Sequence, residues 1–156
     1  MKIEAGQKAP EFSLYDSEKN KVNLSDFKGK NTVLLFFPLA FTGVCTKELC
    51  SIRDNIGQYN STNAQVLGIS VDSIFTLAKF KEEQKLNFPL LSDFNKTTSD
   101  AYGALYHDFV MDMKGVSKRS AFVIDKEGVV RYAEVLDNAG DLPNFEAIQS
   151  TLATLN

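Results

Sequence analysis

An uninterrupted apolar run at residues 33–37 and a largely apolar run at 65–71 mark the interior of this chain. Neither run alternates strictly between apolar and polar side chains, so both predict strands that are buried on both faces of a sheet. Each run is followed by apolar side chains at helical spacing, which predict helices over 42–59 and 73–86. The order strand, helix, strand, helix is typical of an α/β fold.

Shorter elements surround these four, and turn residues such as Gly, Pro, Asp and Asn bound them. Pro89 predicts that the short strand at 88–91 lies at an edge or a bulge, because proline lacks the backbone donor that an interior strand needs. Pro143 is suited to the first turn of the closing helix. The expected elements are hairpin strands at 12–15 and 21–24, the edge strand at 88–91, a helix at 95–102, hairpin strands at 120–124 and 129–135, and a helix at 143–155. Together they predict a central mixed β-sheet flanked by helices, with an N-terminal hairpin extension.

The bulk composition narrows the class of protein. The 156 residues are 44% hydrophobic and carry a net charge of −3 at pH 7. This length predicts one domain, spanning residues 1–156, and the acidic balance argues against nucleic acid as a partner. The longest apolar stretch, 33–41, is interrupted by Pro38 and is too short to span a membrane. Because residues 1–8 lack the apolar core of a secretory signal, we expect a cytoplasmic location.

The most informative residue is Cys45, one of two cysteines in the chain. It follows the apolar run at 33–37 through a turn of Pro, Thr and Gly, where the helix over 42–59 should begin. Backbone N–H groups and the positive end of the helix dipole stabilise an anion at such a position. Since the thiolate is the reactive form of cysteine, the sequence places this thiol where ionisation should be easy.

The second cysteine, Cys50, lies five residues after Cys45. In an intact helix their Cα atoms would be about 8.7 Å apart, beyond the roughly 7 Å that a disulfide spans. We therefore expect both thiols to be reduced while the helix is intact, and to join only if its first turns unwind. Such a pair suits a redox cycle better than a permanent structural bridge.

Pro38 and Thr42 each have a functional and a structural interpretation. In the functional one, Pro38 shields one side of a pocket and the Thr42 hydroxyl bonds to the Cys45 thiolate or to a bound oxygen. In the structural one, Pro38 ends a strand, Thr42 caps a helix, and Cys45 is a small buried apolar residue. The residue types alone leave both interpretations open.

Three segments resemble the peroxiredoxin family. Residues 36–45 contain Pro-x-x-x-Thr-x-x-Cys, which is similar to the active-site motif of that family. Residues 9–14 resemble its N-terminal start, and 119–125 with Gly128 resemble its arginine-bearing strand and the following turn. The resemblance covers most of the chain. It implies a thioredoxin-like fold and a thiol-dependent peroxidase that reduces hydrogen peroxide and organic hydroperoxides.

The resemblance also implies roles for single residues. Cys45 is the peroxidatic nucleophile, and Pro38, Thr42 and Arg119 build its pocket. Glu48 lies on nearly the same helical face as Cys45, where related subgroups carry a glutamate that orients the arginine.

The residues alone do not select these two charged groups. Lys118 and Arg131 are as plausible as Arg119 for a cation near the thiol, and only the resemblance selects Arg119. Without it, Glu48 is equally well a first-turn partner of the helix dipole.

Cys50 matches the Q type of the family, the bacterioferritin comigratory proteins, where the second cysteine resolves the first. Residues 36–42 are more similar to the alkyl hydroperoxide reductase E type, which usually lacks that cysteine. We favour resolution by Cys50 as an intrachain disulfide, then reduction by a thioredoxin-like dithiol protein. The alternatives are a one-cysteine peroxiredoxin resolved by an external thiol, and a non-enzymatic peroxide sensor.

The sequence gives little support for a site built on histidine, a metal ion or an organic cofactor. His107 is the single histidine and is expected on a loop or an aromatic-lined surface. A zinc site would have to use His107 with both cysteines, whose spacing lies at the edge of the usual range, so neither metal, haem nor flavin is expected. Phe41, Phe94 and Phe109 are candidates for a dimer surface, and we expect a monomer or a homodimer.

Overall fold

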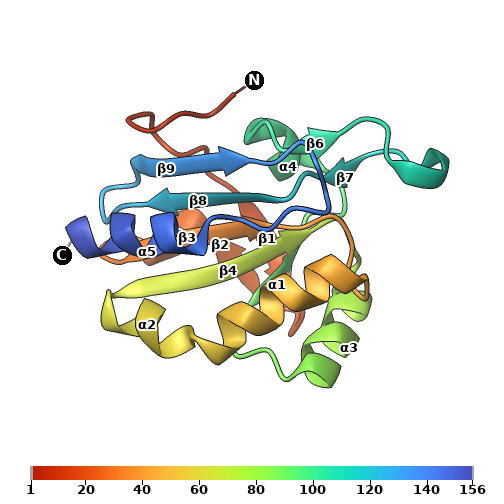
Figure 1. Ribbon diagram of the computed structural model, residues 1–156, viewed down its shortest axis with the longest axis horizontal. Helices are drawn as coiled ribbons and strands as arrows, with labels where there is room; N and C mark the ends of the chain where they lie inside the picture. The colour runs from red at the N-terminus through yellow and green to blue at the C-terminus, as the bar shows by residue number, and fades with distance from the viewer. Residues whose placement is uncertain (1, 156) are drawn as a thin grey trace.

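A mixed β-sheet forms the centre of the molecule (Figure 1). The computed structural model describes residues 2–155, and over that range seven strands pair in the order β2-β1-β5-β4-β3-β8-β9. β3 is parallel to β4 and β4 to β5, while the remaining pairs are antiparallel. The strands are β1 (Ser13–Asp16), β2 (Lys21–Asn23), β3 (Asn31–Phe36), β4 (Ala64–Ser70), β5 (Leu90–Ser92), β8 (Ser120–Ile124) and β9 (Val130–Val135).

Helices cover both faces of this sheet. α1, α2, α3 and α5 pack on one face, which is the front in Figure 1, while α4 and the N-terminal segment lie behind it. The two-stranded sheet of β6 and β7 lies beyond one end of the main sheet. The bounds are α1 (Gly43–Asp54), α2 (Ile56–Ser61), α3 (Ile74–Gln84), α4 (Thr97–Ala101), α5 (Phe145–Thr154), β6 (Leu105–Tyr106), β7 (Val116–Ser117) and the 3₁₀ turns η1 (Leu24–Phe27) and η2 (Val110–Asp112).

The apolar run at residues 33–37 supplies both halves of the core. Val33, Leu35 and Phe37 pack with the helices of the front face, and Leu34 and Phe36 pack with the residues behind the sheet. Because successive strand residues point to opposite faces, a strand covered on both sides must be apolar throughout. The continuous run is thereby explained, and the thioredoxin-like α/β fold is confirmed.

Two predicted boundaries were wrong, for local reasons. The helix expected over 42–59 is two helices, α1 and α2, which meet at Asn55. The Asn55 side-chain amide donates to the carbonyl of Ser51, so it competes with the helical hydrogen bonds at that point. The closing helix begins at Phe145 rather than at Pro143, because the Asn144 side chain caps it by accepting from the backbone N–H of Ala147.

The strand expected at 88–91 is present, but the prediction that it lies at a sheet edge was wrong. β5 lies inside the sheet, between β1 and β4. Pro89 precedes the paired residues, and its carbonyl accepts a hydrogen bond from Gly68 of β4. The missing N–H of proline is therefore not needed by the ladder. Within the described residues no helix has the length and apolar character needed to cross a membrane.

Candidate active site

Strand register brings Cys45 and Arg119 to the same end of the sheet. β3 and β8 are antiparallel with Phe36 opposite Ser120, so the end of β3 lies beside the start of β8. Arg119 directly precedes β8, and the chain leaving β3 reaches Cys45 in the first turn of α1. Residues that are 74 apart in the sequence thus become neighbours.

Arg119 is the centre of a buried polar cluster. Its Nη2 atom lies 3.2 Å from Cys45 Sγ, and its Nη1 atom donates to Glu48 Oε1 at 2.7 Å. Nε and Nη2 also donate to the carbonyl of Ala139, at 3.2 and 2.9 Å. Cys45, Glu48 and Arg119 are each at most 1% exposed. The guanidinium is therefore held on three sides, and its positive charge is fixed beside the sulfur.

Burial and pairing act on the ionisation of this cluster in opposite directions. Burial raises the pKa of Glu48 from 4.5 to about 7, although the charge and hydrogen bond of Arg119 oppose this rise. For Arg119, burial alone would lower the pKa, but Glu48 and Cys45 together outweigh it and raise the pKa. The guanidinium thus stays charged, while Glu48 changes its charge near neutral pH. Among the described residues, Glu48 Oε2 has no hydrogen-bond partner.

The loop between β3 and α1 is anchored by a neighbouring carboxylate. Asp72 Oδ2 accepts from the backbone N–H of Ala40 at 2.8 Å and from the Ser70 hydroxyl at 2.6 Å. Phe41 adopts a left-handed backbone with φ of 67° and packs its ring edge-on against Phe80. These contacts fix the path of the chain into the first turn of α1.

Pro38 and Thr42 lie on this loop in different environments. Pro38 is buried, and Thr42 is exposed at the position preceding α1. The Thr42 side chain does not cap the helix: its hydroxyl donates to the carbonyl of Leu39 at 2.7 Å. A hydroxyl has one donor and two acceptor lone pairs, so Thr42 Oγ1 presents acceptors to the surface.

Cys50 lies in the later part of α1, away from the arginine cluster. Its Sγ donates to Gln84 Oε1 at 3.4 Å, and its side chain is half-buried. Both cysteines are free thiols. The helix is intact between them, as expected for the reduced pair.

The other candidate residues from the sequence analysis, Lys118, Arg131 and His107, are not part of the arginine cluster. Lys118 pairs with Asp137 at 3.7 Å, and Arg131 pairs with Asp125 at 2.7 Å. His107 is exposed after β6. Within residues 2–155 no group of three or more His, Cys, Asp or Glu side chains is arranged to hold a metal ion.

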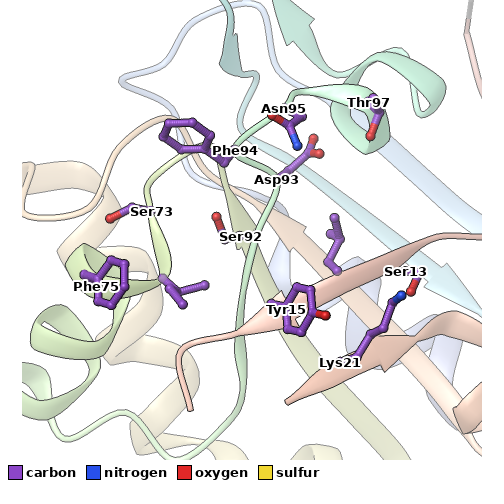
Figure 2. A pocket seen from close by; sticks show the side chains of 12 residues that line it. Ser13, Tyr15, Lys21, Ser73, Phe75, Ser92, Asp93, Phe94, Asn95 and Thr97 are labelled. Carbon is purple, nitrogen blue, oxygen red and sulfur yellow. The ribbon is translucent and has the colours of Figure 1, made fainter. Parts of the chain in front are cut away.

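The aromatic side chains proposed for a dimer surface differ in exposure. Phe41 and Phe94 are exposed, whereas Phe109 is half-buried against the ring of Tyr106. Phe94 borders a depression of about 560 Å³ between the β1–β2 hairpin and the start of α3, which Tyr15 and Phe75 also line (Figure 2). This depression contains neither cysteine.

Three residues that hold the site together were missed by the sequence analysis. Ala139 acts through its backbone carbonyl, which carries no side-chain signal. Asp72 lies 32 residues from Ala40, so its contact with the loop depends on the tertiary fold. Gln84 lies 34 residues from Cys50, so its contact depends on the tertiary fold.

The matched family and relatives agree with this geometry. A family model described as the AhpC/TSA family matches residues 5–133. The chloroplastic 2-Cys peroxiredoxin of Spinacia oleracea is 40% identical over 161 residues, covering 96% of this chain and 58% of that protein. A putative peroxiredoxin of Coxiella burnetii is 42% identical over 132 residues, covering 83% of this chain and 87% of the relative.

Solved structures give the same assignment. The crystal structure of peroxidoxin BcpB from Mycobacterium tuberculosis matches with a TM-score of 0.87 and 29% identity, over 99% of both chains. The present chain spans 58% of the length of its chloroplastic relatives from Spinacia oleracea and Arabidopsis thaliana, but most of the length of the bacterial ones. With a family model over most of its length and relatives at 40% and 42% identity, this chain belongs to the AhpC/TSA family and is a peroxiredoxin that resembles the bacterioferritin comigratory subgroup.

Proposed function

We propose that this protein is a thiol-dependent peroxidase that reduces hydrogen peroxide and organic hydroperoxides. The observation that carries the proposal is the 3.2 Å contact between Arg119 Nη2 and Cys45 Sγ, in a cluster almost closed to solvent. The guanidinium places positive charge beside the sulfur that would act as the nucleophile, and the thiolate is the reactive form of cysteine. Membership of the family supports the same chemistry.

The proposed reaction at Cys45 is a two-electron oxidation of sulfur. The thiolate attacks one peroxide oxygen, a sulfur–oxygen bond forms and the oxygen–oxygen bond breaks. The leaving oxygen takes a proton and departs as water or an alcohol, and Cys45 becomes a sulfenic acid. The leaving oxygen develops negative charge, which Arg119 and the N–H groups of the first turn of α1 would stabilise.

The surrounding residues have positioning roles in this proposal. Thr42 Oγ1, with its own proton donated to Leu39, accepts the peroxide O–H and directs the other oxygen away from the loop. Pro38 closes one side of the pocket. Glu48 orients Arg119, and near neutral pH its partial protonation leaves more of the guanidinium charge for Cys45.

Cys50 is the proposed resolving thiol. It attacks Cys45 Sγ, a disulfide forms within one chain, and the sulfenic oxygen leaves as water. A thioredoxin-like dithiol then reduces the disulfide, which fits a reducing compartment such as the cytoplasm. The support is that two free thiols lie on one helix, which begins at the exposed Gly43.

Peroxide consumption with a regenerating dithiol tests the proposed function. We expect many turnovers per protein molecule, and no turnover in the Cys45→Ser variant with an unchanged circular dichroism spectrum. A single turnover per molecule would instead favour a peroxide sensor. Full turnover in Cys50→Ser with a monothiol reductant alone would favour the one-cysteine alternative.

A further inference from the structure

We propose that Gln84 is a positioning residue for the resolving step, which holds the Cys50 thiol against the end of α3 until the two helices separate. The inference rests on the proposed function, because it concerns only the reaction of Cys50 with oxidised Cys45. It adds one requirement to that step: Cys50 must break its hydrogen bond to Gln84 before it reacts.

Three hydrogen bonds join the later part of α1 to the end of α3, and we call them the α1–α3 latch. Cys50 Sγ donates to Gln84 Oε1 at 3.4 Å. Arg53 Nη1 donates to the backbone carbonyl of Gln84 at 2.5 Å, and Asn87 Nδ2 donates to the carbonyl of Arg53 at 3.2 Å. Gln84 thus takes part in two of the three bonds, one through its side chain and one through its backbone.

The end of α3 explains why Gln84 is available for this role. α3 ends at Gln84 because Lys85 adopts a left-handed conformation with φ of 53°. The last carbonyls of a helix lack helical partners, and a cation near them interacts favourably with the helix dipole. Arg53 fills that place, and fixing the Gln84 backbone directs its side chain at Cys50.

The chemistry of the amide makes the contact selective for one protonation state. A glutamine carbonyl oxygen accepts from an S–H group but offers no proton to a thiolate. Loss of the Cys50 proton in this position would leave two electron-rich atoms facing each other. The charge of Arg53 opposes this effect, although its Nε and Nη1 atoms are directed at Asp54 and at the Gln84 carbonyl. The latched thiol is therefore a poor nucleophile.

Release of the latch competes with a second oxidation. Cys50 must lose its bond to Gln84 before its sulfur attacks Cys45 Sγ, forms the S–S bond and displaces the sulfenic oxygen as water. While Cys50 stays latched, a second peroxide can oxidise the sulfenic acid to sulfinic acid. Gln84 would thus set both the rate of disulfide formation and the peroxide tolerance.

Rapid quenching tests this inference in the full chain. Each sample is mixed with peroxide, quenched by alkylation at set times, and analysed by mass spectrometry. This separates sulfenic acid formation from disulfide formation without a fluorescent reporter, which suits a protein with no tryptophan. The variants are Gln84→Leu, Gln84→Glu and, as a matched control on the exposed face of α2, Gln58→Leu.

We expect the first step to be unchanged in all variants. Disulfide formation should be about two- to tenfold faster in Gln84→Leu, the factor equivalent to one lost hydrogen bond. It should be slower than wild type in Gln84→Glu, because a carboxylate opposes the Cys50 thiolate further. The peroxide concentration that inactivates half of the enzyme should rise in the first variant and fall in the second, and Gln58→Leu should match wild type.

The outcomes separate this inference from the proposed function. If the intrachain disulfide forms at the same rate in every variant, the latch role is wrong and the proposed function stands. If Cys50 stays a free thiol in the wild type while peroxide is consumed, the proposed resolving role of Cys50 and this inference are both wrong, and the peroxidase function of Cys45 stands. Should Gln84→Leu not fold, Gln84→Glu carries the test by itself. An unchanged rate of disulfide formation in that variant would contradict the inference, and a slower rate would support it.

Discussion

Arg119 and Cys45 are joined by a 3.2 Å contact that ties the start of α1 to the strand β8 across the site. The same guanidinium donates two hydrogen bonds to the Ala139 carbonyl, which lies outside α1, so Arg119 stays in place if α1 unwinds. A thiolate strengthens this contact and a sulfenic acid weakens it, because oxidation removes the negative charge. Oxidation of Cys45 would therefore loosen the first turn of the helix that separates it from Cys50.

Removal of the arginine should slow oxidation of Cys45. We expect Arg119→Ala to lower the second-order rate constant with peroxide by about 100- to 1,000-fold, the range for loss of a donor that stabilises developing charge. Rapid-quench kinetics measure this directly. Arg131→Ala is the matched control, because Arg131 pairs with Asp125 instead, and equal losses in both variants would refute the assignment.

The Thr42 hydroxyl should contribute a smaller, specific effect. Thr42→Val keeps the shape of the side chain but removes the acceptor, and we expect peroxide oxidation to slow by about tenfold. Thr42→Ser restores the hydroxyl and should recover most of the rate. If the valine and serine variants react equally fast, Thr42 does not bind the substrate.

The ionisation of Glu48 should make stability depend on pH. Its pKa is raised from 4.5 to about 7 in the folded protein, mainly by burial, with Arg119 opposing the rise and Glu134 adding to it. Between these values the folded state holds a proton that the unfolded state has lost, so stability falls as pH rises through this window. The loss should reach roughly 3 kcal/mol above pH 7.

Urea unfolding at a series of pH values tests this dependence. Glu48→Gln cannot titrate at this position, so its stability should change less than that of wild type between pH 4.5 and pH 7.5. Glu83→Gln, an exposed change on α3, should keep the wild-type profile. Parallel profiles for wild type and Glu48→Gln would show that Glu48 does not carry the dependence.

The disulfide form should have a loosened α1. Two Cα atoms about 8.7 Å apart in a helix exceed the roughly 7 Å limit of a disulfide, so residues 43–50 must unwind for the bond to form. We expect faster amide hydrogen exchange there in the disulfide form than in the dithiol form. α5 serves as the internal reference, and unchanged exchange in α1 would argue against local unwinding.

The sequence predicted the elements better than their arrangement. The apolar runs at 33–37 and 65–71 identified the central strands because burial on both faces leaves a continuous signal. Pro89 misled the placement of β5, since the rule for proline applies to paired residues and Pro89 lies just before them. Asn55 ended α1 through a side-chain bond that hydrophobic periodicity does not report.

The site was predictable only where a motif or a local position marked it. Cys45 was identified from its place after a strand and before a helix, whereas Glu48 was selected only by the family resemblance. Arg119 could not be separated from Lys118 by residue type, and the β3–β8 register places it beside the thiol. Ala139 contributes a backbone carbonyl, for which no residue type is diagnostic. The single-domain organisation and the state of monomer or homodimer stay predictions.

Peptide mapping of the oxidised protein tests the central claim most directly. The dithiol form is treated with one equivalent of peroxide, alkylated, digested and analysed by mass spectrometry under non-reducing conditions. The account predicts one dominant product, a Cys45–Cys50 disulfide within a single chain. It would be contradicted if Cys50 stayed a free thiol while catalytic turnover continued, or if the only disulfides joined two chains.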